Sequence, residues 1–193
     1  SITTILTRKA VDFINRKASE PFFLYFPHPM PHVPLGVSEK FADKSKYGKY
    51  GDVIMEIAWS GKQLVEALKK NGIADNTLII FTSDNGPWKN FGDHGGTTAG
   101  LREGKGTSWE GGHKVPCVMN WHGKIPKGLE DSSYLLSRSS ILPSSKNSIL
   151  SNRSLSTLTL FLAKASYSFN GISFKISFFS VNSYGKSTLI QRL

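Results

Sequence analysis

The sequence predicts an α/β fold, in which helices cover a sheet of buried strands. Two short runs, residues 22–26 and 78–81, are wholly apolar and are bounded by turn residues. A pattern with helical spacing precedes each run. Strands that are buried on both faces are typically continuous apolar runs, and such strands alternate with helices in α/β proteins. We therefore expect strands covered by helices on both sides.

Residues 5–18 form the first expected helix. Its apolar side chains fall on one side, and its basic side chains fall on the other: Ile2, Ile5, Leu6, Ala10, Phe13 and Ile14 against Arg8, Lys9, Arg16 and Lys17. Ser19, Glu20 and Pro21 end this helix, and residues 22–26 follow as a strand. Four prolines in residues 27–34 then preclude regular structure and hold His28 and His32 in a stiff extended loop. We interpret His28 as a loop histidine.

Residues 52–70 form the second expected helix, with Asp52 as its cap and Asn71-Gly72 as its stop signal. The strand at residues 77–81 completes a strand-helix-strand unit with an expected right-handed crossover. A further strand is expected within residues 113–121, and residues 122–128 are expected to form a turn-rich loop. The single cysteine, Cys117, is interpreted as a buried structural thiol.

The stretch from residue 78 to residue 112 carries the candidate chemistry. Its strand ends in a polar loop that contains Asp84 and Asn85, and Lys105 follows between two glycines. Oxygen ligands suit a hard cation such as Ca²⁺ or Mg²⁺, and a lysine offers a compact positive charge for an anion. Nine glycines between Gly86 and Gly112 allow positive φ and close backbone approach. The alternative is an ordinary surface loop, in which Asp84 and Asn85 only form a turn.

Length and charge restrict the remaining possibilities. A chain of 193 residues suits one domain of common size, and its start at Ser1 rather than Met indicates a cut. No apolar stretch approaches the roughly 20 residues of a membrane span. Residues 1–131 hold 17 Lys and Arg against 14 Asp and Glu, so most of the net charge of +10 comes from the seven scattered basic residues after residue 131. Without a basic cluster, nucleic-acid binding is not expected.

The composition changes at about residue 131, where we place a domain boundary. Residues 131–193 contain 18 of the 25 serines, and residues 132–193 contain no acidic residue. Three interpretations remain open for this basic extension: a divergent continuation of the fold, a disordered extension, or a reading-frame slip after a genuine domain. The absence of acids favours the last. We therefore expect residues 1–130 to form the domain, and residues 131–193 not to complete its sheet.

Several blocks occur in an order that resembles the arylsulfatase-like sulfatases: residues 21–25, 31–34, 50–52, 82–87, 101–106, 110–112, 115–116 and 123–126. The resemblance covers roughly residues 5–130. It implies the alkaline-phosphatase superfamily and a three-layer α/β/α sandwich, incomplete in this chain and followed by an irregular extension. It also implies hydrolysis of sulfate esters through a formylglycine, assisted by Ca²⁺.

Residue roles follow from the resemblance alone. Asp84 and Asn85 are implied to bind the metal, and Lys105 and His32 are implied to contact the sulfate ester as catalytic and substrate-binding residues. His94 is implied to touch substrate, with a hydrogen-bonded loop role as the alternative. The nucleophile motif of Cys or Ser, any residue, Pro, any residue, Arg is absent from residues 1–193, as are two further metal-binding aspartates. We therefore expect no turnover by this chain alone.

The resemblance leaves two other functions open, a phosphatase or phosphodiesterase of the same superfamily and a decayed module without chemistry. It implies a sulfated small molecule or glycan as substrate, and an exported or lysosomal location. The sequence indicates neither the identity of the substrate nor the oligomeric state.

Overall fold

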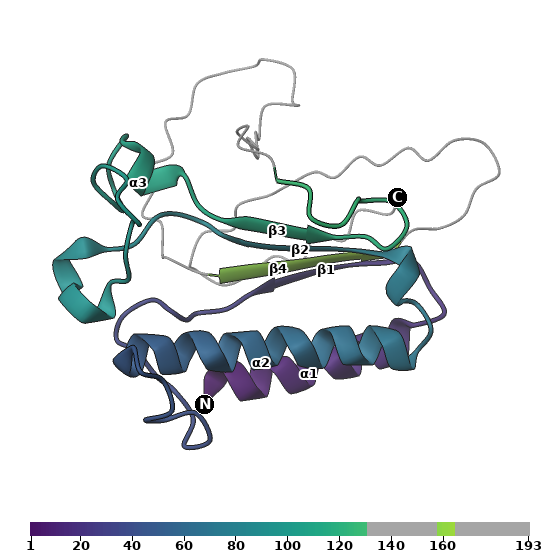
Figure 1. Cartoon of the computed structure of the whole chain (residues 1–193). Coiled ribbons are helices and arrows are strands. Elements are labelled where there is room, and N and C mark those ends of the chain that lie inside the picture. The colour runs from purple at the N-terminus through teal and green to yellow at the C-terminus, as the bar shows by residue number, and fades with distance from the viewer. Residues whose placement is uncertain (131–157, 165–193) are drawn as a thin grey trace, which may run out of the picture. The chain divides into compact units, whose positions relative to one another are not determined.

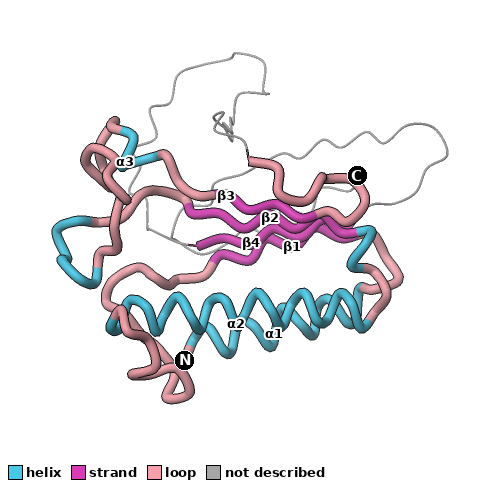
Figure 2. The backbone as a smooth tube through the Cα atoms, viewed as in Figure 1, coloured by secondary structure: helices cyan, strands magenta, loops and turns pink. Residues whose placement is uncertain are grey.

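A computed structural model describes residues 1–130 and 158–164 of the chain. Contacts divide the chain into two units, and all but one of the described residues belong to the unit of Ser1–Leu129 with Arg153–Ser166. Its elements (Figure 2) are α1 (Ile2–Lys17), β1 (Phe22–Pro27), α2 (Gly48–Lys70), η1 (Ala74–Asn76), β2 (Thr77–Ser83), η2 (Lys89–His94), α3 (Glu110–His113), β3 (Cys117–Asn120) and β4 (Leu158–Lys164). The α/β class expected from the sequence is confirmed.

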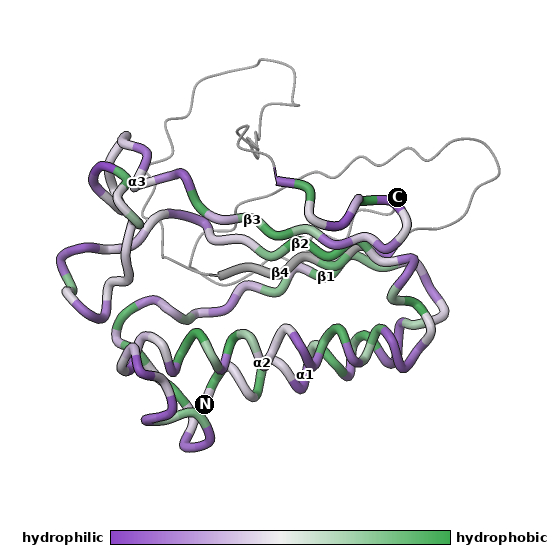
Figure 3. Tube along the Cα trace, viewed as in Figure 1, coloured by the Kyte–Doolittle hydropathy of each residue, from purple (hydrophilic) through white to green (hydrophobic). Residues whose placement is uncertain are grey.

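The strands form one sheet in the order β1-β4-β2-β3. Because β4 is antiparallel to both β1 and β2, those two strands run parallel to each other, with α2 between them in the chain. The loops that follow β1 and β2 therefore leave the sheet at the same end, on the left of Figure 1. Figure 3 shows hydrophobic residues along much of β2 and mainly hydrophilic residues in these loops. The sheet thus brings two polar strand ends together.

The strand β4 contradicts our expectation that residues 131–193 do not complete the sheet. It lies between β1 and β2, with Leu162 opposite Leu24 on one side and Ile79 on the other. The side chain of Leu162 is fully buried. The run Leu-Thr-Leu-Phe-Leu-Ala at residues 158–163 is apolar enough for a strand, but only long-range pairing reveals its position. The boundary at residue 130 stays a prediction, and the rest of the extension lies outside the described residues.

Helices α1 and α2 pack side by side on one face of the sheet (Figure 1). Ser1 caps α1 by accepting the backbone N–H of Thr3 at 3.1 Å. The core between helices and sheet contains Ala10, Ile14, Phe26, Leu64, Ala67, Leu68, Ile73 and Leu162. The expected apolar face of α1 was wrong at its start, since Ile2 and Ile5 are exposed. Thr3 and Thr7 are buried instead, because the hydroxyl of Thr7 bonds across to α2.

The two faces of the sheet differ in their covering. Along β1, Phe22, Leu24 and Phe26 pack on the helices, whereas Phe23 and Tyr25 are 46% and 39% exposed. The expectation that this strand is buried on both faces is therefore wrong for the described residues. These contain the sheet and one helical layer of the α/β/α sandwich. No helix among them combines the length and apolar character needed to cross a membrane.

Asp52 does not cap α2, because the helix already begins at Gly48. The side chain is buried in the first turns of the helix and accepts three backbone N–H groups from the preceding loop. The oxygen-to-nitrogen distances are 2.9, 3.0 and 2.7 Å for Asp43, Lys44 and Ser45. These bonds, that of Ser45 first, hold the pKa of the Asp52 carboxyl below its usual range. Asp52 therefore fixes the loop before α2.

Cys117 is exposed, so its interpretation as a buried thiol is wrong. It begins β3, which pairs only with β2 among the described strands and lies at the edge of the sheet. Partial burial raises the pKa of its thiol. The strand occupies Cys117–Asn120 within the expected range of residues 113–121, and His113 instead ends α3.

Candidate functional site

The candidate site is built from loops that follow β1 and β2. His32 lies in residues 28–34, which follow β1. We call residues 101–112 the Lys105 loop. Backbone bonds fasten the Lys105 loop to the chain just after β2: Gly86 N–H donates to Gly112 O at 2.9 Å, and Lys105 N–H donates to Pro87 O at 2.9 Å. The position of Lys105 is therefore set by the end of β2.

Glycine is required where these loops cross. A Cβ atom on Gly86 would lie 1.7 Å from the carbonyl oxygen of Gly111, and one on Gly111 would lie 2.1 Å from the carbonyl oxygen of Glu103. Both contacts are to backbone, which cannot move aside without opening the loop. Glu103 itself has a φ of +59°, and Gly106 has a φ of +85°. The glycine-rich sequence thus allows the close packing that presents Lys105.

Trp88 lies at the centre of the site. The Lys105 Nζ atom is 4.7 Å from the centroid of its indole ring, and the centroid of the His32 imidazole is 5.8 Å away, tilted by 57°. Trp88 lies two residues after Gly86 in the sequence, close to the candidate residues Asp84 and Asn85. The structure brings His32 and Lys105, which are 73 positions apart, against one side chain.

The charges at the site oppose each other. Partial burial lowers the pKa of Lys105, and the nearby negative charge of Asp84 raises it. Asp84 is exposed just beyond the end of β2. The ammonium group of Lys105 is therefore partly desolvated, a condition that strengthens its attraction for an anion.

The orientation of His32 is fixed by its own backbone neighbour. Its Nδ1 atom lies 2.6 Å from the carbonyl oxygen of Val33. A carbonyl only accepts hydrogen bonds, so the proton of the neutral ring must be at Nδ1. The Nε2 atom then remains as the ring nitrogen that can meet a ligand.

Asn85 offers an acceptor that the fold does not use. Its amide Nδ2 donates to the carbonyl oxygen of Gly86 at 2.7 Å, which fixes the orientation of the side chain. The Oδ1 atom is buried without a hydrogen-bond partner. A buried acceptor of this kind is costly unless something occupies it. The adjacent carboxylate of Asp84 and this amide oxygen fit a hard cation such as Ca²⁺. Among the described residues, no group of three or more His, Cys, Asp or Glu side chains could hold a metal ion.

The structure also places the two other histidines that the sequence analysis singled out in this part of the chain. His94 is exposed at the end of η2, and no described contact joins it to the other candidate residues. Its role at substrate stays a prediction. His28 is buried with only 1% exposed, against Phe26 and Ser60, so it is an interior residue rather than an ordinary loop histidine. Ser60 comes from a distant part of the chain, and a local pattern does not show that contact.

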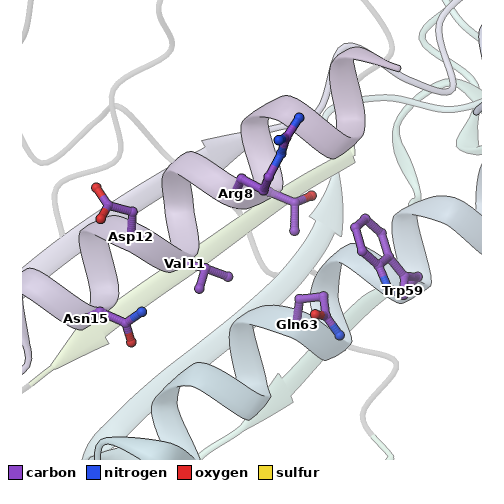
Figure 4. Close-up of a pocket in the computed structure, with 7 residues that line it drawn as sticks. Arg8, Val11, Asp12, Asn15, Trp59 and Gln63 are labelled. Carbon is purple, nitrogen blue, oxygen red and sulfur yellow. The ribbon is translucent and has the colours of Figure 1, made fainter.

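A separate groove of about 230 Å³ lies between α1 and α2 (Figure 4). Polar side chains from both helices line it, including Arg8, Asp12 and Gln63. None of the five candidate residues contributes to it. The groove is therefore distinct from the loops at the end of the sheet.

Comparisons with known proteins bear on the family. The sulfatase family model matches residues 2–147. An arylsulfatase of Hemicentrotus pulcherrimus is 37% identical over 130 residues, and human steryl-sulfatase is 38% identical over 133 residues; they cover 67% and 66% of this chain. An N-acetylgalactosamine-6-O-sulfatase of Bacteroides thetaiotaomicron is 38% identical over 133 residues, which cover 64% of this chain. The residues matched by the family model include α1 to β3 and the loops that carry the candidate residues.

The solved structure of Ps i-CgsB in complex with k-i-k-neocarrahexaose is similar in three dimensions. It aligns with a TM-score of 0.60 and 37% sequence identity over 66% of this chain and 30% of that chain. The chain spans 24%, 23% and 26% of the lengths of the three curated relatives. Family model, relatives and structure agree with the resemblance seen in the sequence, and the chain belongs to the sulfatase family.

Proposed function

We propose that this chain carries part of a site that hydrolyses sulfate esters. The observation that carries the proposal is the meeting of His32 and Lys105 at Trp88, at the strand end where Asp84 and Asn85 lie. A cationic group, a ring nitrogen and two oxygen ligands come together there from two loops that follow parallel strands. This is a suitable arrangement for an ester that carries negative charge on its sulfuryl oxygens.

Each side chain has a defined task in this proposal. The ammonium of Lys105 attracts sulfuryl oxygens, and its partial desolvation makes that attraction stronger than at an exposed lysine. The Nε2 atom of His32 faces the ester oxygen, because Nδ1 is engaged with Val33. Asp84 and Asn85 would hold Ca²⁺ through a carboxylate and the unpaired Oδ1 atom. When bound, that cation would polarise the sulfuryl group.

The formylglycine of the family does not fit the residues of this chain. Residues 1–193 contain no Cys or Ser followed by any residue, Pro, any residue and Arg. Cys117 is followed by Val118, Met119 and Asn120, so it does not meet the motif either. We therefore derive no nucleophilic step for these residues and assign them only the binding of the sulfuryl group and the cation.

The substrate class is proposed from the relatives. Their names include N-acetylgalactosamine-6-O-sulfatase and steryl-sulfatase, and the similar solved structure contains k-i-k-neocarrahexaose. We propose a sulfated glycan or a smaller sulfated molecule for this site. An exported or lysosomal location is proposed on the same analogy with the family.

Binding measurements test the proposal without requiring turnover. Calorimetric titration of the 193-residue chain with inorganic sulfate, in the presence of Ca²⁺, is expected to show binding that Lys105→Ala weakens but does not abolish. Lys62→Ala is the matched control, because Lys62 is an exposed lysine of α2 that pairs with Glu66 at 3.7 Å. Titration with Ca²⁺ alone is expected to weaken in Asn85→Ala. Sulfate affinity that is equal in wild type and Lys105→Ala would contradict the proposal.

A further inference from the structure

Trp88 has contacts that packing alone does not explain. Its ring belongs to neither of the two hydrophobic clusters of the described residues, which are built from α1, α2, the sheet and residues 30–37. Its ring neighbours are instead Lys105, His32 and Phe91. Two of these three are the side chains to which we assign the sulfuryl group. Trp88 is therefore placed to determine where both of them lie.

The indole ring is itself held on several sides. Phe91 meets it edge-on, with ring centroids 4.6 Å apart and planes at 70°. The backbone oxygen of Trp88 accepts the N–H of Phe91 at 3.2 Å and would lie 2.2 Å from a Cβ atom on Gly95. The preceding residue, Pro87, accepts the backbone N–H of Lys105. The ring is therefore fixed relative to the Lys105 loop before any ligand binds.

Two forces attach the charged groups to this ring. A lysine ammonium near an aromatic ring is attracted by the negative charge of the ring face, and Trp is the strongest partner among the aromatic residues. The imidazole of His32 packs on the same indole as a tilted aromatic pair. A long lysine side chain would otherwise sample many rotamers in solvent. Because the ring already restricts the rotamers of Lys105, the side chain loses less conformational entropy when it binds an anion.

We propose that Trp88 is a positioning residue of the sulfate site, holding the ammonium of Lys105 and the imidazole of His32 at one indole ring. This inference rests on the proposed function, since it concerns the same site. It adds that the positions of the two groups are coupled. A change at the ring alters the position of Lys105, from the loop after β2, and that of His32, from the loop after β1. Trp88 acts through these residues and is not assigned a contact with substrate.

The test compares variants that keep or remove the ring. Trp88→Phe retains an aromatic face, and Trp88→Leu retains apolar volume without one. Trp59→Leu is the matched control, because Trp59 also has a lysine at its ring, with Lys40 Nζ at 4.9 Å, but lies in α2 beside the groove of Figure 4. Sulfate titration in the presence of Ca²⁺ is expected to show about fivefold weaker binding for Trp88→Leu and less than about twofold for Trp88→Phe. Trp59→Leu is expected to bind as wild type does.

A double-mutant comparison separates positioning from general destabilisation. In the Lys105→Ala background, Trp88→Leu is expected to weaken any residual sulfate binding by a smaller factor than in wild type, because one of its two partners is gone. An equal factor in both backgrounds, or no effect of Trp88→Leu in wild type, overturns the inference. Thermal unfolding of each variant shows whether the chain is still folded.

A second measurement uses the wild-type chain alone and needs neither a ligand nor a substituted variant. Protons near the face of an indole ring resonate upfield, so the ε protons of Lys105 are expected upfield of those of exposed lysines in the NMR spectrum of the wild-type chain. Unshifted Lys105 ε protons overturn the inference. If they are shifted but sulfate does not bind the wild-type chain, the positioning by Trp88 stands and the proposed function fails.

Discussion

His28 and Ser60 meet in the interior, where Nε2 of the imidazole lies 3.4 Å from the hydroxyl oxygen of the serine. The Ser60 hydroxyl is also 2.6 Å from the hydroxyl of Thr7, which donates to the carbonyl oxygen of Thr3. Because the hydroxyl proton of Thr7 is used in that bond, the Thr7 oxygen must accept the hydroxyl proton of Ser60. The Ser60 oxygen must then accept a hydrogen bond from Nε2 of His28. The proton of neutral His28 is therefore at Nε2, and Nδ1 is the buried atom without a partner.

The burial of His28 predicts a loss of stability in mild acid. Burial lowers its pKa to about 4, against the opposing charge of Glu56. The unfolded chain, with an ordinary histidine pKa near 6.5, then binds the proton more readily than the folded chain. Stability is complete above about pH 6.5 and falls as the pH decreases toward 4, by about 3 kcal/mol over that range.

Urea unfolding between pH 5.5 and 7.5 measures this effect before the carboxyl groups titrate. We expect the slope of unfolding free energy against pH to disappear in His28→Gln. The control is His122→Gln, because His122 is exposed and pairs with Asp75 at the surface. Retention of the full slope in His28→Gln would show that another group is responsible.

The central position of β4 predicts a large effect of truncating Leu162. Its side chain is fully buried between the sheet and the helices, so Leu162→Ala is expected to lower the free energy of unfolding by about 2–5 kcal/mol. Leu129→Ala is the control, since Leu129 is 68% exposed and its loss should change stability by less than about 0.5 kcal/mol. Amide exchange should also be slow in residues 158–164. Fast amide exchange in these residues, together with equal stability of both variants, would contradict the position of β4 in the sheet.

The crossing of the loops predicts opposite effects of alanine at two glycines. Gly86→Ala places a methyl group against the carbonyl of Gly111 and is expected to destabilise the chain by about 1–3 kcal/mol and to weaken sulfate binding. Gly61→Ala lies in α2 with nothing within 4 Å of the new atom, and should stabilise by about 0.5–1 kcal/mol. Urea unfolding and calorimetry measure both variants. Normal sulfate affinity in Gly86→Ala would mean that Lys105 does not depend on this crossing.

The absent nucleophile motif predicts no turnover by residues 1–193. We expect the chain with Ca²⁺ to release no p-nitrophenol from p-nitrophenyl sulfate, because none of its residues meets the motif. An intact sulfatase serves as the positive control. Turnover that disappears in Lys105→Ala would contradict this prediction and would identify a nucleophile within these residues.

Sequence patterns located α1, α2, β1 and β2 to within a few residues, because short-range periodicity determines helices and buried strands. They did not locate β4. The end of α2 at Lys70 and the start of β1 at Phe22 agree with the sequence prediction. The start of α2 was placed too late, since the residues before Asp52 carry no apolar periodicity. The buried side of α1 was also misjudged at its beginning. There, threonine hydroxyls that find hydrogen-bond partners are buried in preference to isoleucines.

The sequence predicted which types of residue form the candidate site, but not how their side chains are arranged in space. Asp84, Asn85 and Lys105 stand in one glycine-rich stretch, and a strand end makes their proximity expected. The role of Trp88 depends on His32, which reaches it from another loop, and no local pattern reports that contact. His28 was misread for the same reason, because its partner Ser60 is 32 residues away.

By itself, the sequence determined the α/β class, the resemblance to sulfatases and the oxygen and nitrogen groups available for an anion and a cation. These properties depend on residue type and on spacing along the chain. The tertiary structure alone decided that β4 separates β1 from β2, and that His32 and Lys105 share one indole ring. Such contacts arise from the packing of distant segments, whose pairing is selected by the burial of the whole sheet.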